Sequence, residues 1–244
     1  MIRLENVTLE LGGKKVLYNV SLRLHEGETK VILGPSGAGK TTILKAILGL
    51  LRPQSGRVTV CGVELTRLRE RDIIPVRREI GMVFQGNALF DSLSVAENIL
   101  FFVRENNRMS ETEMDQIVED MLQLCNLGAI GSLMPDELSG GMRKRVAIAR
   151  ALAFHPKIIL YDEPTTGLDP INARMITDVM DKLGSERHVG SVVVTHILRD
   201  AYSVADTVAM IKEGVIVFDG SFDEIRSSQE SFIQEFLSEI NYSD

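Results

Sequence analysis

The sequence predicts an α/β fold, in which the strands of a parallel sheet alternate with helices. Residues 30–33, 158–161 and 192–195 are short apolar runs bounded by polar or turn residues, which is typical of buried strands. Apolar side chains recur at helical spacing in residues 40–51, after the first run, and in residues 171–183, between the other two. This strand–helix–strand order favours a parallel sheet with crossover helices.

Three N-terminal segments have a different pattern. Residues 2–11, 16–24 and 57–63 alternate between apolar and polar side chains and are separated by Gly-Gly-Lys and Pro-Gln-Ser-Gly turns. We expect them to form an antiparallel flank to the main sheet. Residues 87–155 are mostly helical in pattern, and we expect an inserted helical subdomain there within one domain that spans residues 1–244.

The C-terminal tail, residues 221–244, carries an apolar stripe at helical spacing with acidic residues beside it. The stripe predicts a helix that either packs on its own core or lies in a groove of the other protomer or of an accessory subunit. Its members are Phe232, Ile233, Phe236, Leu237 and Ile240.

Composition excludes several classes of protein. The chain has 244 residues and a formal net charge of −7, which argues against a nucleic-acid binder because such proteins cluster Lys and Arg. Its longest apolar stretches, such as residues 99–103, are far shorter than the roughly 20 residues of a bilayer span. The N-terminal residues lack a signal-peptide pattern. Cys61 and Cys125 have no CxxC spacing, and we expect both to be buried, reduced thiols of a cytosolic protein.

A phosphate-binding loop follows the first predicted strand. Residues 34–41 match G-x-x-x-x-G-K-[ST] in full, a pattern that a chain of this length meets by chance roughly 1% of the time. Its glycines let backbone N–H groups point at phosphate oxygens, and the next helix adds its positive N-terminal end. Lys40 is expected to reach the β- and γ-phosphates, and the Thr41 hydroxyl to bind Mg²⁺. The sequence therefore predicts a nucleoside triphosphate site.

Two carboxylates end the second predicted strand. Asp162 would lie near the metal, where a carboxylate holds Mg²⁺ or its water. Since side chains alternate along a strand, Glu163 should point elsewhere, and it suits the polarisation of an attacking water. By itself an acidic pair after a strand is more often a solvated strand end, but the complete phosphate loop favours the catalytic interpretation.

A second anion-binding helix start follows Leu-Ser-Gly-Gly-Met at residues 138–142. Ser139 is suited to cap the helix, and Gly140 and Gly141 are expected to leave its N-terminus sterically open. One chain would then carry two phosphate-seeking helix ends about 100 residues apart. One nucleotide bound in one chain would not require two such helix ends.

With these motifs the whole chain resembles the ATPase subunit of an ABC transporter. Besides the phosphate loop, the Asp-Glu strand and the Leu-Ser-Gly-Gly signature, three more positions match: Gln85, Asp169 and His196. The resemblance implies a P-loop NTPase (RecA-like) core with the antiparallel flank and the helical subdomain. It also implies a head-to-tail homodimer, in which each ATP lies between one phosphate loop and the partner's signature.

The resemblance further implies a role for each matching residue. Gln85 would contact the metal and the attacking water, His196 would contact the γ-phosphate, and Asp169 would couple the two nucleotide sites of the dimer. The alternative for His196 is a histidine at the end of a strand that forms a hydrogen bond with the backbone. The catalytic set is Glu163, His196 and Gln85, and the metal set is Thr41, Gln85 and Asp162. The nucleotide contacts are Gly34, Pro35, Ser36, Gly37, Ala38, Gly39, Lys40, Thr41, Thr42, Ser139, Gly141 and Asp169.

Two further strings narrow the resemblance. Residues 84–90, Phe-Gln-Gly-Asn-Ala-Leu-Phe, and residues 133–142, Leu-Met-Pro-Asp-Glu-Leu-Ser-Gly-Gly-Met, are most similar to ATPases of MCE-type (Mla-like) phospholipid transporters. That similarity implies a peripheral place on the cytoplasmic face of the inner membrane. The implied partners are an integral-membrane permease, an MCE lipid-binding protein and a small accessory subunit.

One position departs from the family pattern. An aromatic residue that stacks on adenine usually precedes the first glycine of the flank, and here that position is Leu11. An aliphatic side chain offers dispersion but no stacking, so we expect weak discrimination between ATP and GTP unless Tyr18 or a partner supplies a ring.

Two functions remain as alternatives to phospholipid transport. One is the ATPase of an importer for another small solute, and the other is a soluble ABC ATPase of DNA repair or translation. Repair members carry long coiled coils and translation factors fuse two such domains, and the sequence has neither feature. A P-loop switch protein with a coincidental signature is disfavoured by the matches at Gln85, Asp169 and His196.

Overall fold

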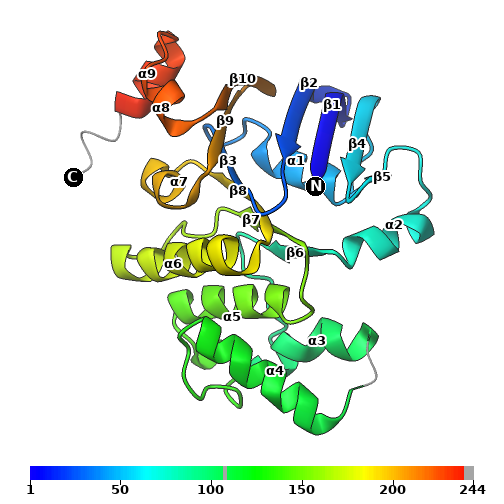
Figure 1. The fold of residues 1–244 in the computed structure, drawn as a ribbon, viewed down its shortest axis with the longest axis vertical. Helices are drawn as coiled ribbons and strands as arrows, with labels where there is room; N and C mark the ends of the chain where they lie inside the picture. The colour runs from blue at the N-terminus through cyan, green and yellow to red at the C-terminus, as the bar shows by residue number, and fades with distance from the viewer. Residues whose placement is uncertain (107–108, 239–244) are drawn as a thin grey trace.

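The computed structural model describes residues 1–106 and 109–238, which form two β-sheets and the helices around them (Figure 1). The strands are β1 (Ile2–Leu11), β2 (Lys14–Leu24), β3 (Thr29–Leu33), β4 (Ser55–Val60), β5 (Val63–Glu64), β6 (Ile80–Val83), β7 (Ile158–Asp162), β8 (Gly190–Thr195), β9 (Thr207–Lys212) and β10 (Val215–Gly220). The helices are α1 (Lys40–Ile47), α2 (Glu70–Arg77), α3 (Val95–Asn106), α4 (Glu111–Leu124), α5 (Gly140–Leu152), α6 (Pro170–Arg187), α7 (Leu198–Val204), α8 (Phe222–Arg226) and α9 (Ser231–Ser238), with a 3₁₀ turn, η1 (Pro135–Glu137), before α5.

The main sheet has the strand order β10-β9-β3-β8-β7-β6, and all its neighbouring pairs are parallel except β10 with β9. Every residue of β3, β7 and β8 is buried. A parallel sheet covered on both faces needs apolar side chains at successive positions, which is why these strands appear as continuous apolar runs. The predicted α/β class and its three buried strands are confirmed.

The two faces of the main sheet contribute to different cores. On β7, Ile159 and Tyr161 belong to a core shared with α5 and α6, whereas Ile158 and Leu160 belong to one shared with α1 and the antiparallel strands. The alternation of side chains along a strand separates the two sets. The phosphate-loop helix therefore lies between the two sheets, and the signature helix lies on the opposite face of the main sheet (Figure 1).

The antiparallel sheet has the order β2-β1-β4-β5, which confirms the predicted flank. The single strand predicted at residues 57–63 is wrong, because β4 ends at Val60 and β5 begins at Val63. Cys61 and Gly62 form the turn between them with φ of +49° and +79°. In this turn Cys61 is half-buried, so the expectation of a buried thiol is wrong at Cys61, whereas Cys125 is buried as expected. Positive φ angles at both central residues suit a tight hairpin turn. Because cysteine does not indicate such a turn in a sequence, the turn was not predicted.

The first predicted helix is shorter than expected. The apolar spacing continues to residue 51, but α1 ends at Ile47. The chain then passes through Leu48 and through Gly49, whose φ is +64°. A glycine in this left-handed conformation just past the last turn is a common helix stop.

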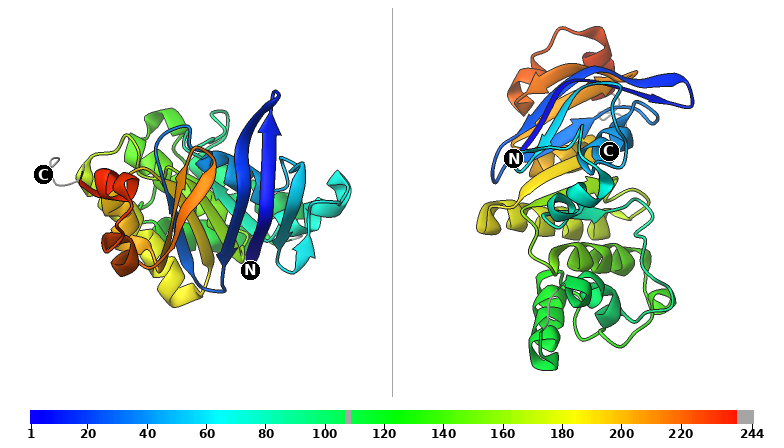
Figure 2. Two further views of the ribbon diagram at one scale, coloured as in Figure 1. Left: turned by 90° about the horizontal axis from the view of Figure 1, so that it is seen from above. Right: turned by 90° about the vertical axis from the view of Figure 1, so that its right-hand side faces the viewer.

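The middle of the chain, residues 87–155, contains α3, α4 and α5, which pack on one another in the lower part of the molecule (Figure 2). The amphipathic stripe on α4 buries Val118, Met121 and Leu122. These side chains share one apolar core with α5 and with the helical face of the main sheet. The helical segment is therefore packed continuously onto the sheet.

The described part of the tail packs on its own chain. Ile225 of α8 and Ile233 of α9 are buried in the same core as the helical face of the main sheet. The Lys212 ammonium lies 4.3 Å from the centroid of the Phe232 ring. Of the predicted stripe, Ile240 lies outside the described residues. Within the described chain, no helix has the length and apolar character needed to cross a membrane.

Candidate nucleotide site

The order of three neighbouring strands brings the predicted residues together. β8 pairs with β3 on one side and with β7 on the other, with Leu33 opposite Thr195 and Asp162 opposite Val194. The residues that directly follow these strands are Gly34, Glu163 and His196. Because the carboxyl ends of parallel strands lie at one edge of a sheet, these three positions form a row there.

The phosphate loop connects β3 to α1. Gly39 caps α1 with φ of +109°, and a Cβ atom added there would lie 2.8 Å from Leu17 Cδ2. Gly37 has φ of +80° and faces open space. Both positions need glycine, one for its close approach to β2 and both for their left-handed backbone. The loop can therefore curl around an anion as its sequence predicts.

The residues of the loop differ in burial. Pro35, Ser36 and Gly37 are exposed at its tip, whereas the remaining positions are buried or half-buried. The loop is held from behind by Gly214, whose N–H donates to the Ala38 carbonyl over 3.0 Å. The buried or half-buried positions are Gly34, Ala38, Gly39, Lys40, Thr41 and Thr42.

Lys40 is the central cation of the site. Its side chain is 6% exposed, and its ammonium donates to the Gly34 carbonyl at 2.8 Å and to the Pro35 carbonyl at 3.2 Å. It also lies 3.3 Å from Glu163 Oε1. The loop therefore encloses its own lysine, and the ammonium links the loop to the end of β7.

Glu163 is held by four groups. Its backbone is left-handed, with φ of +49°, and its N–H donates to the Val194 carbonyl. Nδ1 of His196 lies 2.9 Å from Glu163 Oε2, and the Thr166 hydroxyl donates to the same oxygen over 3.0 Å. Burial acts to raise the pKa of Glu163, but the His196 hydrogen bond and the Lys40 charge hold it below its ordinary value. The side chain is therefore a carboxylate at neutral pH.

Asp162 and Glu163 have different hydrogen-bond partners. The Thr41 hydroxyl donates to Asp162 Oδ1 over 2.9 Å. Burial raises the pKa of Asp162, and the Thr41 hydrogen bond partly opposes that rise. A hydroxyl and a carboxylate are the hard oxygen donors that Mg²⁺ takes alongside phosphate oxygens and water, so this pair fits the ion. The described residues contain no group of three His, Cys, Asp or Glu side chains that could hold a metal ion. Mg²⁺ bound together with phosphate oxygens and water does not need such a group.

The signature helix begins at the predicted residue. Ser139 caps α5, because its hydroxyl accepts from the Met142 N–H over 3.2 Å, and both Ser139 and Gly140 are exposed. The expectation of open space is wrong at Gly141, where an added Cβ would lie 2.4 Å from Asn172 Oδ1. Gly141 is therefore required for packing against α6 of its own chain.

Asp169 organises the start of α6. Its carboxylate accepts from the N–H groups of Ile171 and Asn172, and from the Asn172 side chain at 2.6 Å. The Asn172 hydrogen bonds hold the pKa of Asp169 below its usual range. Since Asn172 also contacts Gly141, Asp169 is connected to the signature helix within one chain.

Three predicted residues lie apart from this cluster. Within residues 1–106 and 109–238, no hydrogen bond joins Gln85, Ser139 or Asp169 to Lys40 or Glu163. Gln85 is exposed in the segment after β6, and its backbone carbonyl accepts from Lys144.

Two residues that contact the site were missed by the sequence analysis. Thr166 donates to Glu163, and Lys144 donates to Gln85. A signal for Lys144 exists, because it shares a helix face with Ile148 and Ala151 and places a charge on an apolar stripe. Thr166 has no comparable signal, since hydroxyl residues are common in turns.

Comparison with known proteins identifies the family to which the chain is similar. A sequence profile of ABC transporters matches residues 17–166. The chain is 37% identical over 237 residues to the intermembrane phospholipid transport system ATP-binding protein MlaF of Haemophilus influenzae, covering 97% of this chain and 90% of that protein. It is 39% identical over 241 residues to the arginine transport ATP-binding protein ArtM of Bacillus subtilis, covering 98% and 100%.

A solved structure agrees with the fold. A dimeric post-hydrolysis state of an ATP-binding cassette, bound to ADP and Pi, superposes with a TM-score of 0.83 at 34% identity. The match covers 91% of this chain and 98% of that one. The P-loop NTPase fold is thereby confirmed. The chain belongs to the ABC transporter family and is one of its ATPase subunits.

Proposed function

We propose that the site described above hydrolyses ATP with Mg²⁺ between two copies of the chain, and that this drives a membrane permease. The observation that supports it most is the contact of Lys40, Glu163 and His196 at three adjoining strand ends. The phosphate loop and Lys40 would hold the nucleotide. Glu163 would accept a proton from the attacking water, and His196 would contact the γ-phosphate.

Mg²⁺ would be held by Thr41, Asp162 and Gln85, and would neutralise charge on the transferred phosphoryl group. Thr41 and Asp162 already contact each other. Gln85 would complete the set from the segment after β6. This part of the proposal needs Gln85 to approach the pair, and that approach would couple the segment to the nucleotide.

The dimer is proposed because one chain carries two exposed phosphate-seeking features. Helix α1, which follows the loop, and helix α5, which begins after the Ser139 cap, lie on opposite faces of the main sheet (Figure 1). A second copy placed head to tail would bring its Ser139 and Gly141 to the γ-phosphate held by the first, with Asp169 between the two sites. The dimeric cassette noted above supports this arrangement.

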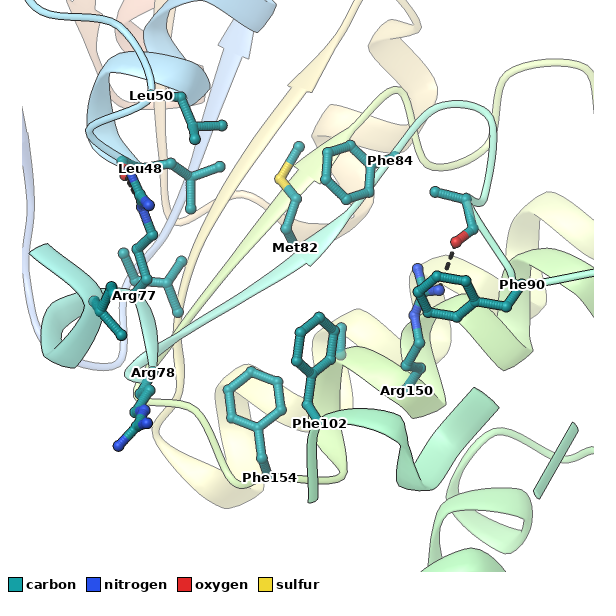
Figure 3. A pocket seen from close by; sticks show the side chains of 14 residues that line it. Leu48, Leu50, Arg77, Arg78, Met82, Phe84, Phe90, Phe102, Arg150 and Phe154 are labelled. Atoms are coloured by element: carbon teal, nitrogen blue, oxygen red, sulfur yellow. Dashed lines mark hydrogen bonds between the residues drawn. The ribbon is translucent and has the colours of Figure 1, made fainter. Parts of the chain in front are cut away.

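An apolar groove of about 710 Å³ lies where β6 meets α3 and α5, and we propose that the permease binds there (Figure 3). Large apolar side chains that are more than a third exposed gather along it. They are Leu50, Ile74, Phe84, Phe90 and Phe102. Concentrated exposed apolar surface of this kind marks an interaction site.

The chemistry of the groove suggests the form of its occupant. Phe102 and Phe154 make an aromatic wall, with ring centroids 6.1 Å apart, and Arg78 is exposed at the rim (Figure 3). A short cytoplasmic helix with an apolar side chain and a carboxylate would suit both features. Since Phe84 lines the groove next to Gln85, such a helix would touch the segment that carries the proposed metal ligand.

Replacing Phe102 by Glu is expected to weaken permease binding about 30-fold or more, because buried aromatic anchors contribute about 2 kcal/mol or more at interfaces. The ATPase activity of the isolated chain should persist. Val63→Glu, at an exposed apolar position of β5 outside the groove, is the matched control. Co-purification of the permease with each tagged variant measures the effect, and equal recovery from both would argue against the groove.

We propose phospholipid as the cargo, and an MCE protein and a small accessory subunit as further partners at the cytoplasmic face of the inner membrane. The similarity to MlaF supports this. Three residues of the string that resembles MCE-type ATPases, Phe84, Ala88 and Phe90, line the groove and therefore face the proposed permease. The alternative, another small solute, is represented by the similarity to ArtM.

Purification of the native complex through a tag on this chain, followed by mass spectrometry of its proteins and lipids, tests the cargo. We expect a permease, an MCE protein and bound phospholipid. Reconstituted complexes should move labelled phospholipid with ATP, and Glu163→Gln complexes should not. Recovery of a solute-binding protein without phospholipid would favour the small-solute alternative.

Base selectivity gives a further prediction. Leu11 and Tyr18 are both partly exposed on β1 and β2, and the Tyr18 N–H donates to Gly214, which supports the phosphate loop. Ring stacking contributes about 0.5–1.5 kcal/mol, so turnover of ATP and GTP by the wild type should differ by less than about tenfold. Leu11→Tyr should increase the preference for ATP. If Tyr18 supplies the ring instead, the wild type will prefer ATP and Tyr18→Leu will remove that preference.

A further inference from the structure

Two buried cations of α5 hold the segment that carries Gln85. Lys144, 2% exposed, donates to the Gln85 carbonyl at 2.7 Å and lies 3.4 Å from the Phe84 carbonyl. Arg150, 4% exposed, donates to the carbonyls of Asn87 and Ala88 at 3.0 and 2.5 Å. Neither charge has a carboxylate within ion-pair distance in the described chain. Their hydrogen bonds are made to backbone across about 60 residues of sequence.

A buried lysine ammonium that donates hydrogen bonds only to backbone carbonyls is unusual in a helix. Burial lowers the pKa of Lys144, and the charges of Asp162 and Glu163 oppose that effect. The ammonium therefore lies within the electric field of the two carboxylates of the site while it bonds to Gln85. An apolar residue at this position would avoid the desolvation cost, so the lysine has a function that packing alone does not require.

The segment does not adopt its path by local preference. Asn87 and Ala88 have φ of +63° and +51°, and two successive left-handed residues without a glycine cost about 1–3 kcal/mol each. The carbonyls of both residues accept from Arg150. The conformation is therefore imposed from α5, the helix whose first turn carries the signature.

We propose that Lys144 is a positioning residue for ATP hydrolysis, which ties the Gln85 backbone to the signature helix so that Gln85 and Ser139 move together. Lys144 lies five residues after Ser139 on the same helix, so the tether is short and rigid. The inference rests on the proposed role of Gln85 in binding metal and water. It adds the residue that would determine where Gln85 lies.

The first test compares Lys144→Met with Lys144→Arg in the full chain. Met keeps the volume and removes the donor, and turnover should fall about 10- to 100-fold because a displacement of about 1 Å can reduce a rate that much. The Mg²⁺ concentration for half-maximal activity should rise, while KM for ATP changes by less than about threefold. Arg keeps charge and donors and should restore most of the turnover.

Arg145→Met is the matched control. Arg145 is a buried cation of the same helix, but it donates to the carbonyls of Cys125 and Asn126 at the end of α4. Thermal unfolding should show similar losses of stability for the two Met variants. Hydrogen–deuterium exchange without nucleotide should be about tenfold faster at residues 84–88 in Lys144→Met only. Equal hydrogen–deuterium exchange rates at residues 84–88 in Lys144→Met and Arg145→Met would refute the proposal that Lys144 holds this segment. Lys144→Leu, which also removes the donor, replaces Lys144→Met if the latter does not fold.

A double-mutant cycle with Gln85→Ala separates the inference from the function on which it rests. If Lys144 acts through Gln85, Lys144→Met lowers turnover in the wild type but adds less than about twofold in the Gln85→Ala background. Equal losses in both backgrounds would mean that Lys144 is merely structural. Wild-type turnover of Gln85→Ala alone would instead refute the role of Gln85, and the exchange measurement would still decide whether Lys144 holds the loop.

Discussion

Replacing Glu163 by Gln is expected to lower the rate of ATP hydrolysis about 10²- to 10⁴-fold, the usual contribution of a general base, and to leave ATP binding intact. Gln has the same shape but is neutral and cannot take a proton from water. Glu163 is ionised in the structure because His196 and Lys40 stabilise its negative charge. That charge is what the substitution removes.

The measurements are single-turnover hydrolysis, nucleotide binding by titration, and size-exclusion chromatography with ATP. We expect the variant to accumulate as an ATP-bound dimer, because hydrolysis would be the step that reopens it. Glu79→Gln is a suitable control, since Glu79 forms a surface ion pair with exposed Lys157 and such pairs contribute little. Wild-type turnover by Glu163→Gln would refute the assigned role.

Replacing Lys40 by Met is expected to weaken nucleotide binding at least about 30-fold, because loss of one member of a buried charge contact costs about 2–5 kcal/mol. Lys40 is buried in the loop, where its ammonium donates to the Gly34 and Pro35 carbonyls and lies beside Glu163. Turnover should be lost together with binding.

Equilibrium titration with a fluorescent ATP analogue checks this result, with Lys182→Met as the control at an exposed site on α6. The two variants separate binding from chemistry. Glu163→Gln should bind without hydrolysis, whereas Lys40→Met should not bind. Unchanged nucleotide affinity in Lys40→Met would refute the proposal that the phosphate loop binds the nucleotide.

Strands with a continuous apolar run could be predicted from the sequence. β3, β7 and β8 lie at the centre of a sheet that is covered on both faces, so almost every position is apolar. β6 was not predicted, because it has only four residues, includes Gly81, and exists through its pairing with β7. The β4–β5 turn was missed because Cys61 is no turn signal.

The candidate site also has one part that could be predicted from the sequence and another that could not. Residues 34–41 are contiguous, and the groups that would bind phosphate are their own N–H donors, so the motif is visible in the sequence alone. The contact of Gly141 could not be predicted from the sequence. Gly141 packs against Asn172, about 30 positions later in the chain, and no local sequence pattern indicates this contact.

The sequence by itself determined that this chain has a phosphate loop, a strand that ends in two carboxylates and a capped signature helix, because each depends on neighbours in the chain. Only the tertiary structure decided that Glu163 contacts both Lys40 and His196, and that Lys144 holds Gln85. These contacts follow from the strand order β3-β8-β7 and from the packing of α5 beside β6. Strand order and helix packing are set by the burial of whole faces, and that free energy is a property of the assembled fold.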